Sequence, residues 1–394
     1  MPGPLAGLKI LDFSTLLPGP FATMWLADLG ADVVRVENPS RPDVVRFLPP
    51  FDGEVSAWHA TLHRSKRSLT LDLKQPGAAG IVQRLVQTYD ILLEQFRPGV
   101  MARLGLGYEA LRDANPRLIY VALTGYGQSG PYRDRAGHDI NYLALSGIAD
   151  HTGRVESGPI PLGVQVADVG AGALPAVIGL LAAVIQRQSS GHGQMVDVSM
   201  LDGAIGWNAL AASQFFVGGA GPGRESETLN GGSYYDYYQT SDGRWLAVGS
   251  LEPKFWAAFC QAVARPEWLA RGLSLDPAGQ QALKADIRQL IAGRSLADWA
   301  AIFAGVDACV EPVLTTAEMT THPHTQARNL VVNVPKPDGS QQRQIGQPLK
   351  FSAAAPEYRH VGPRPGAHNQ EILQAAGYTP AEIAAFQAQG VLGS

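Results

Sequence analysis

The amino-acid sequence predicts an α/β protein with two domains, and three observations support this prediction. Near-continuous apolar segments alternate with segments of helical periodicity in the first half of the chain. A glycine-rich segment, 218–223, is followed by a region of different character. Hydrophobic residues make up 45 % of the 394 residues and charged residues only 17 %, below the usual share. This composition excludes a mostly disordered chain and indicates extensive burial, including burial in subunit contacts.

Five apolar segments in the first third of the chain predict the strands of a buried sheet: 8–13, 31–37, 68–73, 90–94 and 117–123. Helical periodicity lies between them, over 21–29 and over 77–89. Pro20 precedes the first of these helices, and proline favours the first turn of a helix. Apolar strands separated by helices are typical of a parallel sheet that is covered on both faces. The sequence therefore predicts an open, Rossmann-like α/β layer.

The most apolar helix is predicted over 174–187, followed by a strand over 195–200 and a helix over 204–217. Residues 169–185 carry no charged side chain, so a membrane span has to be considered. This stretch is short for a span, and it contains Gly170, Gly172 and Pro175, which weaken or break helices. We therefore expect a buried helix and no membrane segment.

A smaller α+β domain is expected after the glycine-rich segment. Residues 234–240 and 245–248 flank a turn that contains Asp242-Gly243, and this pattern is typical of a β-hairpin. Helical segments follow over 254–264, 279–292 and 295–304. The proline- and glutamine-rich end is expected to run along the surface to a short helix over 380–389. The predicted division of the chain is 1–217, 218–329 and 330–394.

Charge and cysteine content limit the function classes. The formal net charge is −4 and there is no basic block, so we expect no nucleic-acid partner. Two cysteines do not make a disulfide framework, which fits a reducing cytoplasm. The first five residues have neither the basic nor the apolar region of a signal peptide. We therefore expect a cytoplasmic protein.

Three motifs have ordinary structural interpretations. Residues 125–130 match GxGxxG after a predicted strand, but polar residues 131–135 follow where a dinucleotide site needs a helix, so NAD binding is not expected. His322 and His324 have no carboxylate or cysteine cluster nearby, so no metal site is expected. Cys309 is interpreted as a small buried hydrophobe rather than a nucleophile.

The polar residues between 135 and 168 are the most informative. The segment Gly137-His138-Asp139-Ile140-Asn141-Tyr142 places a histidine beside a carboxylate and an amide. Asp168 precedes the apolar helix, where a carboxylate is stabilised as the anion and is also an ordinary helix cap. A structural and a catalytic role for His138 are equally compatible with the sequence. Periodicity and spacing thus lead to an α/β protein with a candidate His138/Asp168 acid–base pair.

Short segments over most of the chain resemble the class III CoA-transferase family. They are 5–12, 18–22, 26–37, 65–69, 96–100, 104–108, 125–131, 187–191 and 193–194. Within the family, residues 137–142, 251–255 and 307–310 look like the α-methylacyl-CoA racemase branch. Transferases of the family carry a glycine-rich run that covers the catalytic aspartate, and residues 230–233 match that run poorly.

The resemblance implies the catalytic residues and the reaction. His138 falls on a catalytic base, Asp168 on the catalytic aspartate and Glu252 on a supporting glutamate. We therefore expect a 2-methylacyl-CoA racemase, in which two acid–base groups serve opposite faces of the α-carbon. The backbone beside Asp168 is expected to donate to the thioester oxygen. The alternatives are a CoA-transferase that forms a mixed anhydride on Asp168 and a non-catalytic acyl-CoA-binding protein.

The resemblance also implies a ligand site. Positions near CoA are expected at Arg35, Ser65, Lys66, Arg97, Gly137, Asp139, Ile140, Asn141 and Tyr142, and the cationic side chains would pair with phosphates. Asn38 departs from the family, because some racemases have an arginine there that helps to hold CoA. CoA belongs to the substrate, so no separate cofactor and no metal are expected.

The family fold implies a large domain built from both ends of the chain and a small central domain. Two subunits are expected to interlock as a homodimer, with the active site between the large domain of one subunit and the small domain of the other. The low charged fraction of the sequence fits a large subunit interface.

Overall fold

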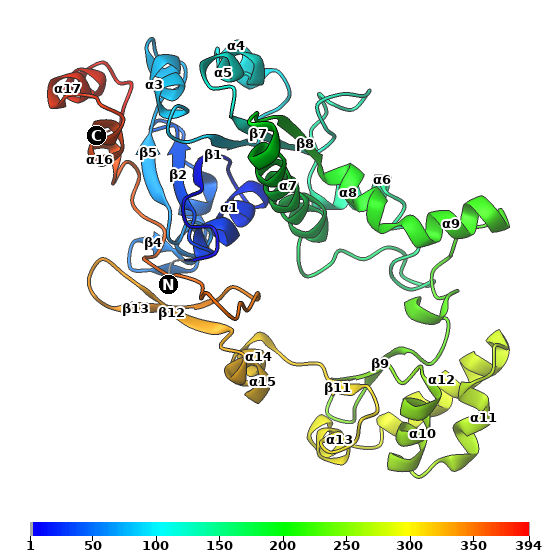
Figure 1. Cartoon of the computed structure of the whole chain (residues 1–394). Helices are drawn as coiled ribbons and strands as arrows, with labels where there is room; N and C mark the ends of the chain where they lie inside the picture. The colour runs from blue at the N-terminus through cyan, green and yellow to red at the C-terminus, as the bar shows by residue number, and fades with distance from the viewer. Residues whose placement is uncertain (1–2, 394) are drawn as a thin grey trace. The chain divides into compact units, whose positions relative to one another are not determined.

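A sheet of six parallel strands organises the computed structural model, which describes residues 3–393 (Figure 1). The strand order is β5-β2-β1-β6-β7-β8. The strands are β1 (Lys9–Phe13), β2 (Asp32–Glu37), β5 (Arg67–Thr70), β6 (Ile91–Glu94), β7 (Ile119–Thr124) and β8 (Met195–Ser199). The predicted parallel sheet is confirmed. The strand order reverses direction at β1 and β6, which is where open α/β sheets bind ligands.

Helices cover both faces of this sheet, as predicted. On one face α1 (Pro18–Asp28) packs against β1 and β2, and α7 (Leu174–Ser190) packs against β7 and β8. The other face meets the main apolar core, to which Leu11, Val34 and Leu92 contribute from the strands. The helices that contribute to this core are α3 (Ala78–Leu85), α4 (Val100–Arg103), α5 (Tyr108–Ala114), α16 (Asn369–Ala375) and α17 (Pro380–Ala388).

The apolar helix predicted over 174–187 is longer in the structure and only partly buried. The π-helical turn η2 (Ala167–Ala173) continues into α7, and Ala167–Ser190 is long and apolar enough to cross a membrane by length and composition alone. One side packs on the sheet, as expected of a core helix. The other side leaves Ile178 and Ile185 each 67 % exposed, so the expectation of a fully buried helix is wrong.

The chain divides into two compact units. The first contains the residues up to Ser146, Leu162–Trp207 and the residues from His324 onward. The second contains Gly147–Pro161 and Asn208–Pro323. The helix expected over 204–217 is two helices, α8 (Met200–Trp207) and α9 (Ala209–Gly218), and the chain passes between the units at the break. These limits differ from the predicted boundaries at 218 and 329.

The second unit combines a three-stranded antiparallel sheet with helices. The predicted hairpin is present, since β9 (Asp236–Gln239) pairs with β10 (Trp245–Val248). The short β11 (Val310–Pro312), which was not expected, adds to the other edge of β10. The helices are α10 (Pro253–Ala262), α11 (Leu269–Gly272), α12 (Pro277–Ile291), α13 (Leu296–Phe303) and α14 (Thr316–Thr321). An aromatic core that includes Trp256, Phe259 and Trp299 joins α10, α12 and α13 to the sheet.

Within the first unit, the buried side chain of Arg64 links the C-terminal segment to the earlier part of the chain. Arg64 donates to both carboxylate oxygens of Asp28 at 2.8 and 2.6 Å, and to Gln344 at 3.0 Å. Gln344 belongs to an antiparallel hairpin that was not expected. This hairpin consists of β12 (Val331–Pro335) and β13 (Gln341–Ile345), and α15 (Pro323–Ala327) precedes it. Earlier in the chain lie β3 (Phe51–Asp52), β4 (Val55–Ser56), α2 (Ala57–Leu62) and α6 (Asp139–Leu145).

Candidate active site

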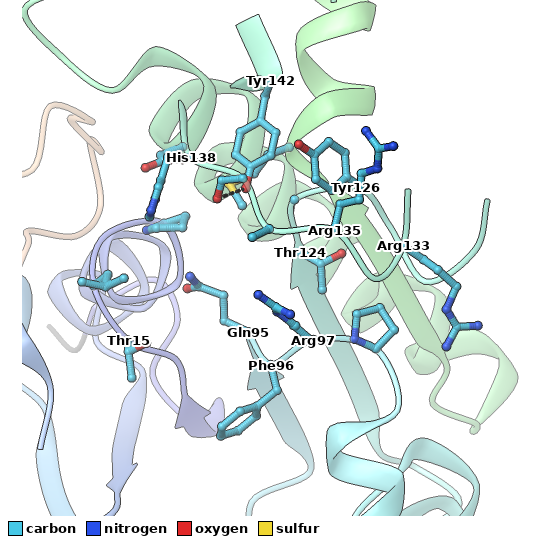
Figure 2. A pocket seen from close by; sticks show the side chains of 18 residues that line it. Thr15, Gln95, Phe96, Arg97, Thr124, Tyr126, Arg133, Arg135, His138 and Tyr142 are labelled. Carbon is cyan, nitrogen blue, oxygen red and sulfur yellow. Dashed lines mark hydrogen bonds between the residues drawn. The ribbon is translucent and has the colours of Figure 1, made fainter. Parts of the chain in front are cut away.

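A cavity of about 360 Å³ opens at the carboxyl ends of β1, β6 and β7 (Figure 2). The segments that follow these strands form one part of its wall, and residues 133–138 form another. The position matches the point at which the strand order reverses. His138 and Asp168, the predicted acid–base pair, both line this cavity, although thirty residues of sequence separate them.

Asp168 lies in the first turn of η2 and faces the cavity. Burial and, to a smaller extent, the nearby Asp139 carboxylate raise the pKa of its carboxyl from 3.8 to about 6, and His138 acts in the opposite direction. The sequence predicted that the helix terminus stabilises the anion here. The structure corrects this prediction, because removal of the carboxyl from water outweighs the helix terminus. A π-helical turn is itself unusual and often occurs at functional sites.

Asp139 explains how this turn is held. Its buried side chain accepts hydrogen bonds from the amides of Ala167 at 2.6 Å and Asp168 at 3.2 Å. These two amides are therefore occupied, and neither is available to the thioester oxygen that we expected the backbone beside Asp168 to contact. The carboxylate of Asp139 connects α6 to η2, so it fixes the position of Asp168 relative to the segment that carries His138.

The backbone around His138 is fixed while its side chain remains exposed. The Asn141 side chain accepts a hydrogen bond from the His138 amide at 2.9 Å. The Tyr142 hydroxyl donates to the Gly137 carbonyl at 2.7 Å. A Cβ at Gly137 would lie 2.6 Å from the Tyr126 hydroxyl oxygen, so a glycine is required there. Burial, together with the carboxylate of Asp168, raises the pKa of Tyr142, which is therefore neutral.

Three exposed arginines, Arg97, Arg133 and Arg135, line the cavity. Figure 2 shows His138 and Arg133 on opposite sides of the cavity. Arg135 lies over the ring of Tyr132 at 3.9 Å, and Arg97 forms no ion pair with any residue between 3 and 393. Arginines are well suited to bind phosphate groups, so this wall fits an anionic ligand.

The other cationic residues expected near CoA lie elsewhere. Arg35 is buried and forms ion pairs with Asp43 at 2.8 Å and with Glu37. Lys66 is fully buried and bonds to Asp12 at 3.2 Å, and burial lowers its pKa to about 8. Neither side chain lines the cavity or reaches solvent. The expected phosphate contacts of Arg35 and Lys66 therefore disagree with the structure.

Five further predicted residues also lie away from the cavity wall: Ser65, Ile140, Asn141, Glu252 and Asp139, whose carboxylate holds η2 where a CoA contact was expected. Ser65 is buried, and its hydroxyl donates to the Glu357 carbonyl at 3.3 Å, so it has a structural partner where a CoA contact was expected. Ile140 and Asn141 are exposed on the first turn of α6. Glu252 is exposed and precedes α10 in the second unit, so its supporting role stays a prediction.

The sequence interpretation missed several residues of the wall. Thr124 is the last residue of β7, and Gln95 and Met200 come directly after β6 and β8. Thr15 and Tyr126 lie two residues beyond the ends of β1 and β7. The signal that identifies them is their position, because the carboxyl ends of parallel strands meet at one edge of the sheet.

Known proteins resemble this chain over most of its length. The model of CoA-transferase family III matches residues 5–369. The chain is 39 % identical to alpha-methylacyl-CoA racemase of Homo sapiens over 385 residues, which cover 96 % of this chain and 95 % of the human protein. It is 34 % identical to succinyl-CoA–D-citramalate CoA-transferase of Chloroflexus aurantiacus, with 99 % and 98 % of the two chains covered. The crystal structure of a CAIB/BAIF family protein from Brucella suis has a TM-score of 0.82 and 29 % identity, and the match covers 95 % of this chain and 100 % of that one.

Proposed function

The chain belongs to CoA-transferase family III, and we propose that it racemises 2-methylacyl-CoA thioesters. The observation that carries the proposal is the placement of His138 and Asp168 on the wall of one cavity. Racemisation requires a group that removes the α-proton from one face of the carbon and a group that returns a proton to the other face. Two acid–base side chains that converge on one space provide this arrangement.

The protonation behaviour of Asp168 supports this chemistry. With a pKa of about 6, its carboxyl reaches both protonation states near neutral pH, so it can serve as base in one direction and as acid in the other. Histidine is the side chain most often used for the same task. The relatives that are racemases favour the same reaction.

The arginine wall supports a CoA thioester as the substrate. We infer that Arg97, Arg133 and Arg135 receive the phosphates of CoA, while the thioester end lies between His138 and Asp168. Arg97 was expected in the ligand site, and Arg133 and Arg135 take the place of Arg35 and Lys66 in this proposal.

A CoA-transferase is the second candidate, because transferases are among the similar relatives at 34 % identity. In that reaction the Asp168 carboxylate attacks the thioester carbon, CoA thiolate leaves, and a mixed anhydride forms on the aspartate. This mechanism gives no role to His138. The presence of His138 beside Asp168 on the cavity wall therefore favours racemisation.

We also propose that the protein is a homodimer. In the second unit, α9 exposes Leu210 to 86 %, Phe216 to 79 % and Val217 to 92 %, and none of its residues is buried. In the first unit, α7 exposes Ile178 and Ile185. Exposed apolar helix faces of this kind mark interaction surfaces.

One experiment separates the two reactions. The protein is incubated with (R)- and with (S)-2-methylacyl-CoA in deuterated water, with and without an added carboxylic acid, and the products are analysed by mass spectrometry. A racemase incorporates one deuterium at the α-carbon and interconverts the enantiomers without the acid. Transfer of CoA to the added acid, with no α-deuterium, would establish the transferase reaction instead.

A further inference from the structure

Glu94 is a buried carboxyl beneath the loop that carries part of the cavity wall. It is the last residue of β6, and it is only 4 % exposed. Gln95, Phe96 and Arg97 follow it directly and line the cavity. The proposed proton transfer gives Glu94 no role, and a carboxyl withdrawn from water is costly unless its partners compensate.

Two hydrogen bonds hold this carboxyl. The Phe96 amide donates to its Oε2 at 2.7 Å, and the Tyr120 hydroxyl of β7 donates to it as well. In the sheet register, Glu94 lies between Phe13 of β1 and Ala122 of β7. Tyr120 lies two residues before Ala122 and so on the same face of β7, which makes it the titratable group that faces Glu94 from these strands. No charged side chain of the described residues is among the influences on its pKa, which burial raises to about 7.

Further contacts hold Gln95 and Phe96, the two residues that follow Glu94. The Gln95 side chain accepts a hydrogen bond from the Gly19 amide at 3.0 Å, at the start of α1. The ring of Phe96 packs against the main core. Gln95 and Phe96 are thus fixed by different neighbours, and Arg97, which follows them, is the exposed member of the loop.

We propose that Glu94 is a positioning residue for CoA, which acts by holding the Phe96 amide and so fixing the loop from which Arg97 meets the phosphates. This inference rests on the proposed CoA-thioester function. An ionised carboxylate binds an amide and a hydroxyl more strongly than a neutral carboxyl does. Ionisation of Glu94 therefore tightens the loop, and CoA binding strengthens as the pH rises through about 7.

The test is calorimetry of CoA binding at about pH 6 and about pH 8, below and above the pKa of Glu94. It is performed in an Asp168→Asn background, which removes the titration of that carboxyl from the cavity. Glu94→Gln keeps a neutral acceptor for the Phe96 amide, and its comparison with the parent protein cancels the titration of CoA itself. Tyr120→Phe removes one donor and leaves the carboxyl in place.

Glu94→Gln is expected to bind CoA as the parent does at the lower pH and about threefold more weakly at the higher pH, because charge-assisted hydrogen bonds are stronger than neutral ones. Tyr120→Phe removes a hydrogen bond that lowers the Glu94 pKa, so it shifts the pH dependence of CoA binding to higher pH. A purely structural role for Glu94 would not produce either pattern.

The outcomes are distinguishable. The first result is the dissociation constant of Glu94→Gln for CoA divided by that of the parent. If this ratio is the same at both pH values, the role of Glu94 is overturned. CoA binding by the parent still upholds the proposed function in that case. Failure of the wild-type protein to bind CoA overturns both. If Glu94→Gln does not fold, as thermal unfolding would reveal, the Tyr120→Phe shift decides alone, and an unshifted pH dependence contradicts the proposal.

Discussion

The carboxyl of Asp168 is kept at a raised pKa by burial, and this has a cost for the fold. The folded-state pKa of about 6 exceeds the ordinary value of 3.8, so folding favours the protonated form. The ionised form therefore destabilises the protein above about pH 6, and this cost disappears as the pH falls below about 4. The proposed reaction uses the ionised form as its base, so the proposed site works against stability here.

Replacement of Asp168 by asparagine is expected to stabilise the protein near neutral pH. The neutral amide avoids the desolvation cost, and the gain should be about 1–2 kcal/mol once the partial exposure of the group is allowed for. At about pH 5 the gain should fall to about half, because part of the wild-type carboxyl is then protonated. Urea unfolding of both proteins at the two pH values measures this difference, and an equal gain at both would contradict the account.

At this scale, sequence reasoning proposed His138 and Asp168, which the structure places on one cavity wall, and missed the contacts that position them. His138 and Asp168 could be predicted from the sequence, because their residue types suit proton transfer and the family resemblance aligned them. The hydrogen bonds from backbone amides to Asp139 and Glu94 could not be predicted, because they depend on which backbone lies nearby in three dimensions. Arg35 and Lys66 were misassigned because burial and ion pairing of a cation leave no mark in the local sequence.

Close helix packing fixes the element that carries Asp168. The turn η2 lies against α8, and a Cβ at Gly203 of α8 would lie 2.1 Å from the Ala171 carbonyl oxygen. That neighbour is backbone and cannot rotate away. The separation of these two elements, and with it the position of Asp168, therefore depends on the absence of a side chain at residue 203.

Gly203→Ala should lower the free energy of unfolding by about 1–3 kcal/mol and reduce racemase activity, because the added methyl forces η2 away from α8. Gly206→Ala is the matched control on the same helix. No atom lies within 4 Å of a Cβ at Gly206, so that substitution should leave stability unchanged or slightly improved. Thermal unfolding and a racemisation assay test both variants, and similar effects of the two substitutions would refute the argument.

Most elements of the fold were predictable because their hydrophobic patterns are strong. The central strands β6 and β7 are nearly continuous apolar runs, and the Asp-Gly turn marked the hairpin of β9 and β10. β11 was missed because three residues give no periodicity. The hairpin of β12 and β13 was obscured by polar residues, although Asp338-Gly339 in its turn was an available signal. The break at Asn208 was missed because apolar residues continue through it.

At the scale of the whole molecule, the exposed apolar side chains of α7 and α9 are the observation on which the proposed homodimer rests. We expect light scattering to give the mass of a dimer across micromolar concentrations. Substitution of Phe216 and Val217 by charged residues should shift the protein toward monomer with little loss of secondary structure, because neither side chain is buried in the chain itself. A wild-type monomer over the same range would contradict this expectation.

The central claim is that His138 and Asp168 serve opposite faces of one α-carbon. The most direct test follows deuterium uptake from each enantiomer of a 2-methylacyl-CoA, with wild-type protein, His138→Ala and Asp168→Asn. Wild type should exchange the α-proton of both enantiomers. Each variant should exchange only the enantiomer whose α-proton faces its remaining base, the two variants should show mirror-image preferences, and neither should interconvert the enantiomers. Full racemisation by His138→Ala would contradict the account.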